Sequence, residues 1–243
     1  SLSNSSSIQL SNSELILQGG ITLNDQSSVS LTRSILRPNG SLSIGSGSLN
    51  LDRSDVSLIG DTILSRDGGV SFDALSLNGN TFSLGSNVTN LGVSDGMSIA
   101  NGERLNSGTS SLQMGMSLSI EIGGILTSES GNVHIEEDLA LDGDLVMEGV
   151  GDLYVFRDLS IGSDGALSTS SGDVIIGIYG GDLMIDGTLD IEGNGNLAVS
   201  GDLDMFGGTL SSGSGDVQIE GVLNIDEGLL DQGGGILNLI GGG

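Results

Sequence analysis

Cysteine, lysine and tryptophan are absent from this 243-residue sequence, and proline and histidine each occur once. Without cysteine the chain has no disulfides, thiolate metal sites or cysteine nucleophiles. Without lysine it has neither the lysine of a phosphate-binding P-loop nor a Schiff-base lysine. Aromatic residues make up only 2% of the chain, so it is poor in the rings that line many ligand sites. These absences remove several large enzyme classes from consideration.

Positive charge is also scarce, because six arginines face 32 acidic residues and the formal net charge is −26. Such a field repels nucleic acids and anionic lipid surfaces, so we exclude both as partners. No apolar run approaches the roughly 18–20 residues that span a bilayer, and no membrane insertion is expected. No signal peptide is visible and the chain starts at Ser1, which indicates a mature product or a piece excised from a longer chain.

What the sequence does contain is a short repeated phrase. An acidic chain with 43 glycines is compatible with disorder, but regular internal repeats argue against it. The phrase is glycine, a polar residue, an aliphatic, any residue, and a second aliphatic. Its leading aliphatic recurs in steps of 20 to 23 residues, with a mean of about 20.8 over eleven steps. These positions are Ile8, Val29, Leu49, Val70, Leu91, Leu112, Val133, Leu153, Val174, Leu197, Val217 and Leu237.

Each period holds two further segments with the same alternation, separated by glycine, serine, asparagine and aspartate corners. The second segment begins at Val56, Leu75, Met97, Leu118, Leu139, Leu159, Leu183, Leu203 and Leu223. The third contains Leu126, Leu145, Leu167, Leu189, Leu210 and Leu230. Three strands per period predict a three-sided parallel β-solenoid in which each strand points two aliphatics inward and one residue outward.

We therefore expect one continuous all-β domain over residues 1–243, a right-handed parallel β-helix of about 11 coils of 20–21 residues. Right-handed winding follows the usual handedness of parallel crossovers. At a strand spacing of about 4.8 Å the rod would be roughly 50 Å long. The stretch from Gly177 to Gly181 lengthens one coil and predicts a small bulge at a corner.

The segments "GNVHIEEDLALDGDLVMEG" and "GDVQIEGVLNIDEGLLDQGG" resemble the β-helix repeats of large secreted bacterial exoproteins, of the filamentous-haemagglutinin-like adhesin and autotransporter passenger type. The resemblance covers almost the whole chain and rests on the repeat pattern. It implies a non-catalytic structural or adhesive rod, secreted or displayed at the cell surface, such as a stalk or a fibre subunit. A surface protein of this kind would bind a cell-surface component or a carbohydrate.

Two other functions are alternatives to the structural rod. A polysaccharide-active β-helix enzyme needs a cleft built from long inserted loops, and the coils vary by only about three residues in length. His134 should point into solvent without the partners of a catalytic triad. Most of the methionines at positions 97, 147, 184 and 205 are expected in the core. An ice-binding solenoid is suggested by an outward serine column, which Ala140 interrupts; its members are Ser57, Ser76, Ser98, Ser119 and Ser160.

The acidic residues are concentrated in the second half of the chain. Residues 1–120 carry nine acids and five arginines, whereas residues 121–243 carry 23 acids and one arginine. In this strongly acidic half, carboxylates recur at strand entrances and should form columns about one coil apart. Such columns are candidate Ca²⁺ ligands, although bonding of each aspartate to its own corner backbone is the favoured interpretation. The candidate calcium ligands are Asp138, Asp152, Asp158, Asp173, Asp182, Asp202 and Asp216.

Both ends of the sequence continue the repeat pattern. Leu2 fits an incoming strand, the first full coil opens at Ile8, and the last strand runs from Ile236 to Ile240. Because unpaired strand edges template further pairing, we expect the ends to meet further repeats of a longer chain or a second copy, head to tail. The residues predicted at these assembly ends are Ile8, Leu10, Leu237 and Leu239.

Overall fold

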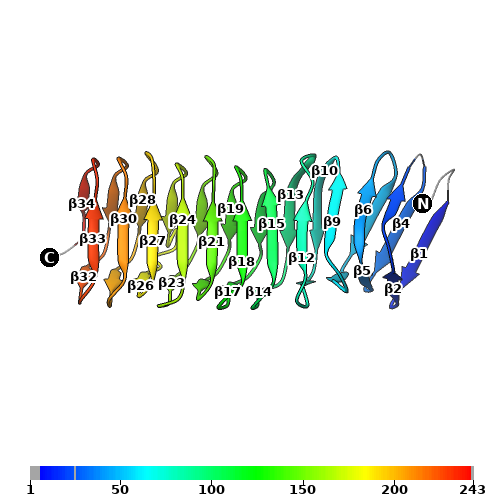
Figure 1. The fold of residues 1–243 in the computed structure, drawn as a ribbon, viewed down its shortest axis with the longest axis horizontal. Helices are drawn as coiled ribbons and strands as arrows, with labels where there is room; N and C mark the ends of the chain where they lie inside the picture. Colours follow the sequence, from blue (N-terminus) through cyan, green and yellow to red (C-terminus); the bar gives the residue numbers. More distant parts are fainter. Residues whose placement is uncertain (1–5, 25, 242–243) are drawn as a thin grey trace.

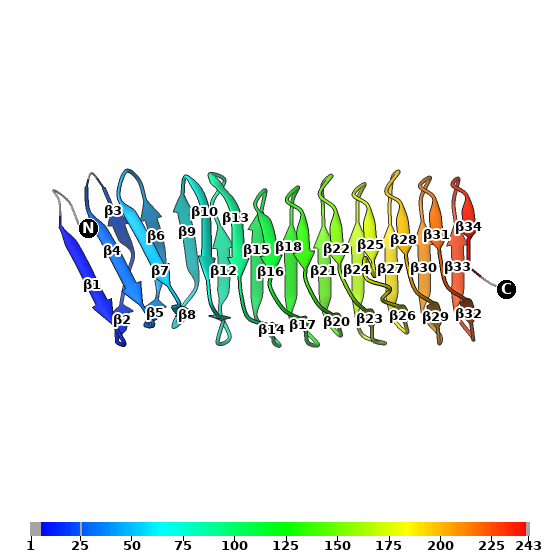
Figure 2. The same cartoon turned by 180° about the vertical axis from the view of Figure 1, so that it is seen from behind.

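The protein is a long, narrow solenoid with its two termini at opposite ends (Figures 1 and 2). The structure, a computed structural model, describes residues 6–24 and 26–241. In this part of the chain every regular element is a β-strand, there are 34 of them, and all pairings are parallel. Leu2 lies outside the described residues. The prediction of an all-β parallel solenoid of about eleven turns is confirmed; its right-handedness stays a prediction.

Each turn contributes one strand to each of three faces, which we call faces one, two and three in chain order. Face one contains β1 (Ser7–Ser11), β4 (Ser28–Thr32), β7 (Ser48–Asp52), β10 (Gly68–Phe72), β13 (Val88–Val93), β16 (Ser111–Met114), β19 (Val133–Ile135), β22 (Leu153–Val155), β25 (Val174–Ile176), β28 (Leu197–Val199), β31 (Val217–Ile219) and β34 (Leu237–Leu239).

Face two is built mostly from three-residue strands. It contains β2 (Glu14–Leu17), β5 (Ile35–Pro38), β8 (Asp55–Ser57), β11 (Leu75–Ser76), β14 (Met97–Ile99), β17 (Leu118–Ile120), β20 (Leu139–Leu141), β23 (Leu159–Ile161), β26 (Leu183–Ile185), β29 (Leu203–Met205) and β32 (Leu223–Ile225).

Face three forms one uninterrupted eleven-stranded sheet from β3 to β33. Its members are β3 (Ile21–Leu23), β6 (Gly40–Ile44), β9 (Thr62–Arg66), β12 (Thr81–Leu84), β15 (Arg104–Gly108), β18 (Ile125–Ser128), β21 (Asp144–Met147), β24 (Ala166–Thr169), β27 (Thr188–Ile191), β30 (Thr209–Ser212) and β33 (Leu229–Gln232). Faces one and two are each divided into two sheets, between β7 and β10 and between β11 and β14.

Neighbouring strands pair in the register that the sequence spacing predicts. A shift of one residue would turn the aliphatics outward, so burial of the core favours this register. On face two, Leu159 pairs with Leu139 and Leu183, and Leu203 pairs with Leu183 and Leu223. The first four of these leucines are buried. Leu223 is half-buried because its coil has a full neighbour on one side only. These leucines therefore stack in one interior column, as the inward orientation predicted for the aliphatics requires.

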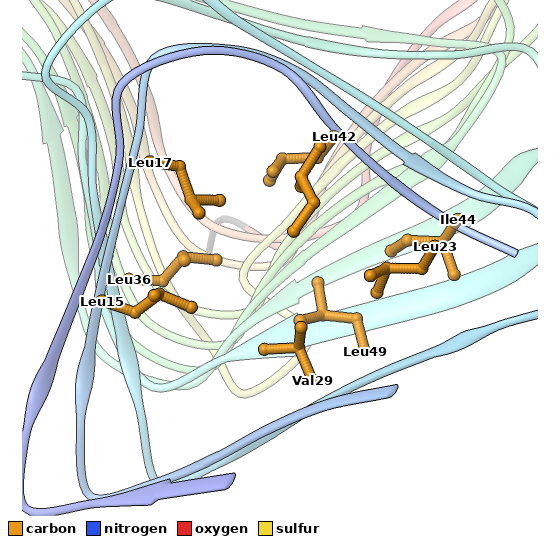
Figure 3. Close-up of a pocket in the computed structure, with 9 residues that line it drawn as sticks. Leu15, Leu17, Leu23, Val29, Leu36, Leu42, Ile44 and Leu49 are labelled. Atoms are coloured by element: carbon orange, nitrogen blue, oxygen red, sulfur yellow. The ribbon is translucent and has the colours of Figure 1, made fainter. Parts of the chain in front are cut away.

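The core is a thin aliphatic column enclosed by the three faces. Figure 3 shows this near the N-terminus, where Leu15 and Leu36 of face two, Leu23 and Leu42 of face three and Val29 of face one point toward one another. The space left among the side chains there is only ≈ 10 Å³, so the core is packed. Because one coil cannot bury its aliphatic residues alone, stability depends on the stacking of neighbouring coils.

The methionines follow the same alternation. Met97, Met147 and Met205 are buried, as predicted for most of this set. Met184 is the exception, with 43% of its surface exposed. It is the middle residue of β26, and the middle residue of a three-residue strand points outward.

Candidate functional site

Two columns of polar side chains run along the acidic half of the rod. The first stands at the entrance to face one and consists of Asn132, Asp152, Asp173, Asn196 and Asp216. Each side chain accepts a hydrogen bond from a backbone N–H of the next coil. Thus Asp173 N–H donates to Oδ1 of Asp152 (2.9 Å), and Asn196 N–H donates to Oδ1 of Asp173 (2.8 Å). Asn132, Asn196 and Asp216 accept in the same way at 2.8 to 3.0 Å.

The second column stands at the entrance to face two and obeys the same rule. Asp182 N–H donates to Oδ1 of Asp158 (2.9 Å), and Asp202 N–H donates to Oδ1 of Asp182 (2.8 Å). The series starts with the longer bonds from Asp158 N–H to Asp138 and from Asp138 N–H to the Ser117 hydroxyl, both 3.3 Å. It ends where Val222 N–H donates to Asp202 (2.7 Å).

All seven predicted aspartates therefore lie in these two columns, four at the entrance to face two and three at the entrance to face one. The interpretation that each aspartate bonds its own corner is wrong. Each reaches the next coil, because consecutive corners lie only one strand spacing, about 4.8 Å, apart. No three acidic or histidine side chains among residues 6–24 and 26–241 are grouped so as to hold a metal ion. Calcium binding stays a prediction.

The glycine that precedes many of these aspartates is a packing requirement. A Cβ at Gly201 would lie 2.1 Å from Oδ1 of Asp182, and one at Gly181 would lie 2.2 Å from the carbonyl oxygen of Arg157. On face one, a Cβ at Gly215 would lie 1.9 Å from the carbonyl oxygen of Gly195. The recurring Gly–Asp pair thus combines close backbone contact with a side chain that caps the next coil.

A cluster of rings lies where face one meets face two, and we call it the aromatic cluster: His134, Tyr154, Phe156 and Tyr179. The rings of His134 and Tyr154 have centroids 4.4 Å apart, and those of Phe156 and Tyr179 are 5.6 Å apart. His134 also lies 6.0 Å from Phe156. The cluster therefore holds the single histidine, both tyrosines and one of the four phenylalanines of the chain.

The predicted bulge brings Tyr179 into this cluster. Gly177 and Gly180 adopt positive φ angles of 75° and 93°, which glycine accommodates at low cost. The turn is closed by a hydrogen bond from Gly180 N–H to the carbonyl of Gly177 (2.6 Å). Tyr179 N–H donates to the carbonyl of Phe156 (3.3 Å), yet 78% of Tyr179 remains exposed. The bulge is thus an ordered turn that projects a ring.

A shallow hollow of ≈ 510 Å³ adjoins Tyr179 and is lined by Asp138, Arg157, Asp158, Gly180 and Gly181. Arg157 is the only cationic residue of the acidic half. It makes no ion pair within the described ranges, where the bridge between Arg37 and Glu14 is the one found. The hollow therefore presents an unpaired hydrogen-bond donor beside two acceptors and an exposed ring.

Tyr154 is half-buried and packs against His134 in the aromatic cluster. Its hydroxyl donates to Oδ2 of Asp152 (3.0 Å). Burial raises the pKa of Tyr154 above its ordinary value of 10.0, and the hydrogen bond and negative charge of Asp152 raise this pKa further, with a smaller effect of Asp173. The phenol is therefore held in its neutral form.

The aromatic cluster was not predicted from the sequence. His134 points outward as expected, but it is half-buried and packs against Tyr154. The available signal was the register: His134 and Tyr154 are both middle residues of face-one strands, 20 positions apart, and pair directly. Tyr179 offered no such signal because it lies outside every strand.

The outward serine column does not form a continuous hydroxyl ladder. Ser57 pairs with Ser76 and Ser98 with Ser119, but the column then passes through Ala140 and Ser160 to Met184. The Ser98 hydroxyl donates to Glu121 (2.8 Å), and the Ser57 hydroxyl accepts from the Asn78 amide (2.9 Å). These side chains already have partners on the rod.

The predicted assembly ends keep aliphatic surface in contact with solvent. Ile8, Leu10 and Leu237 are half-buried, and Leu239 is 51% exposed. The equivalent residues one coil further in, such as Val217 and Ile219, are buried.

In the described part of the chain there is no helix long and apolar enough to cross a membrane. Comparisons with family models, curated proteins and solved structures find no match to this chain.

Proposed function

We propose that the chain is a non-catalytic structural and adhesive rod of a secreted or cell-surface protein, acting as a stalk or as a fibre subunit that assembles head to tail. The observation that carries this proposal is the unbroken eleven-stranded sheet of face three, which ties the coils from β3 to β33 into one body. Continuous hydrogen bonding along the axis favours a stiff spacer. The resemblance to repeats of secreted bacterial adhesins supports the same function.

Head-to-tail assembly is supported by the terminal coils. Their aliphatic residues are arranged in the register of the rod but are only partly covered, as at Leu237 and Leu239. A further coil would bury them and would pair with β34 in the parallel pattern used along the whole axis. Such a contact does not close on itself, so repetition gives a filament. An adjoining repeat of a longer chain would satisfy the same surfaces.

Small-angle X-ray scattering tests the rod. We expect an elongated particle whose length is set by about eleven coils of ~4.8 Å, roughly 50 Å, or a multiple of it. Globular scattering would refute the rod. The non-catalytic assignment is tested by incubating the chain with a set of polysaccharides and measuring newly released sugar ends. Cleavage that is abolished by substitution of an acidic residue would refute this assignment.

Sedimentation and negative-stain imaging over a range of protein concentrations test the assembly. The wild-type chain is expected to lengthen with concentration, whereas Leu239→Asp should remain short because a carboxylate would be buried at the junction. Val150→Asp is the matched control, since Val150 is 72% exposed on the flank of the rod. Equal assembly of Leu239→Asp and Val150→Asp would exclude stacking through this end.

A further inference from the structure

We propose that the corner between faces one and two, at β22 and β26, is a binding site for a neutral saccharide, with the Tyr179 ring as its platform. The ring is 78% exposed and stands beside the ≈ 510 Å³ hollow. Few aromatic residues occur in this chain, and this corner gathers both tyrosines. The flat carbon–hydrogen face of a sugar ring suits an aromatic platform, because such a ring is apolar on its faces.

The platform is held in place before any ligand arrives. The Tyr179 ring packs on Phe156, and its backbone N–H is bonded to the carbonyl of Phe156. Phe156 in turn contacts His134, which stacks on Tyr154. A preordered ring loses little conformational freedom on binding, which favours affinity.

The polar residues around the ring match the edge of a sugar. Arg157 offers several N–H donors and makes no ion pair within the described residues. Asp138 and Asp158 each use Oδ1 to accept a backbone N–H of the next coil, and this bond fixes the carboxylate. Their Oδ2 atoms make no hydrogen bond within residues 6–24 and 26–241 and remain available as acceptors. Donors and acceptors side by side suit hydroxyl groups, which need both.

The same residues select against other ligand classes. An acidic saccharide would be repelled by the 23 acidic residues in this half of the chain. A cationic ligand would be attracted by Asp138 and Asp158, but it would leave Arg157 without an acceptor and beside a like charge. An apolar ligand would desolvate Arg157 and two carboxylates without giving them partners, which is costly. A neutral polyhydroxylated ring avoids the repulsion and gives partners to Arg157 and to both carboxylates.

This inference rests on the proposed function, because it names the partner that an adhesive rod would hold along its side. The two can nevertheless fail separately. Scattering measures the shape of the rod whether or not a sugar binds. Sugar binding at this corner requires only the coils from β20 to β26, whether or not the ends assemble.

The experiment is a titration of the whole chain with neutral oligosaccharides. The probes are oligomers of glucose, galactose, mannose and N-acetylglucosamine, followed by calorimetry. We expect saturable binding of at least one. Trigalacturonate, an acidic trimer, should bind more weakly. The glucosamine trimer, the cationic counterpart of the N-acetylglucosamine trimer, should bind more weakly once high salt screens its attraction to the acidic half. Because the chain has no tryptophan and both tyrosines lie in the aromatic cluster, a change in tyrosine fluorescence of the wild type locates the sugar there.

Substitutions distinguish the site from general stickiness. Tyr179→Ala removes an exposed ring and should lower the affinity about tenfold or more, with an unchanged melting curve. Arg157→Gln should also weaken binding, whereas Val150→Ala, on another corner, should not. The proposal is overturned if no neutral oligosaccharide binds, if either charged trimer binds more tightly than the neutral ones at high salt, or if Tyr179→Ala binds as well as wild type.

Discussion

Substitution of Asp182 separates the two effects that its carboxylate has on stability. Its Oδ1 accepts the N–H of Asp202 at 2.8 Å, and its own N–H donates to Asp158. The hydrogen bond stabilises the stack by about 1 kcal/mol. The carboxylate is also flanked by two others, each about one strand spacing away. At that spacing two unit charges repel by roughly 1 kcal/mol in water.

Substitution of Asp182 by asparagine and by alanine separates the contribution of the hydrogen bond from that of the charge repulsion. Asp182→Asn keeps an oxygen acceptor and removes the charge, and Asn132 and Asn196 already play this part in the other column. Asp182→Ala removes both the acceptor and the charge. The asparagine variant should therefore be more stable than the alanine variant by about 1 kcal/mol. Because the relief of charge repulsion is common to both, this difference should persist at every salt concentration.

The comparison with wild type should depend on salt. At about 0.01 M NaCl the screening length is roughly 30 Å and the repulsion is fully expressed, whereas at about 1 M it is roughly 3 Å and the repulsion is screened. The stability of Asp182→Asn relative to wild type should thus fall by about 1 kcal/mol over this range. Urea unfolding followed by circular dichroism measures all three proteins. Equal stability of the asparagine and alanine variants would refute the stabilising hydrogen bond between coils. A stability difference between Asp182→Asn and wild type that does not change with salt would refute the charge repulsion.

Three further predictions concern packing, cations and pH. Gly215→Ala should cost about 1–3 kcal/mol through overpacking, since its Cβ would lie 1.9 Å from a carbonyl oxygen, whereas Gly19→Ala meets nothing within 4 Å and should melt like wild type. If the aspartate columns bind Ca²⁺, millimolar Ca²⁺ should raise the melting temperature more than NaCl of equal ionic strength; equal shifts would leave screening as the explanation. In a Tyr179→Phe background, ultraviolet titration should show that Tyr154 ionises above its ordinary pKa. The neutral Tyr154 phenol should stabilise the fold fully below about pH 10, and this stabilisation should be lost as pH rises through the raised pKa. Asp152→Asn should lower that pKa, and an unchanged midpoint would contradict the assigned cause.

The fold was predictable because one requirement, inward aliphatics every second residue, repeats at nearly every coil. Val133, Leu153 and Val174 could be aligned by spacing alone, and they pair in that register. The division of face one between β7 and β10 was not predictable. The step from Leu49 to Val70 is 21 residues, like its neighbours, and spacing does not indicate whether two stacked strands form a complete hydrogen-bonded ladder.

The candidate site was predictable only where it follows the repeat. The aspartate columns were located by spacing, but the atoms they bond were not, because an acceptor can reach its own corner or the next coil. The aromatic cluster depends on a departure from the repeat. Tyr179 lies 23 positions after Phe156, and the turn between Gly177 and Gly180 determines where its ring points. Loop conformation of this kind is not encoded in the spacing of the strands.

Part of the uneven charge of the chain follows from which side chain caps the coils. In the first half, the Ser34 hydroxyl accepts the N–H of Ser13, and the Ser54 hydroxyl accepts the N–H of Ser34, both at 3.2 Å. In the second half, aspartates such as Asp182 and Asp202 accept at the same corner, but from the N–H of the following coil instead of the preceding one. The backbone requirement is the same in both halves, but a hydroxyl meets it without charge and a carboxylate adds one negative charge per coil. The carboxylates of Asp138, Asp158 and Asp182 are exposed, and this charged flank disfavours lateral association. The repulsion between stacked carboxylates offsets part of the stabilisation from their hydrogen bonds.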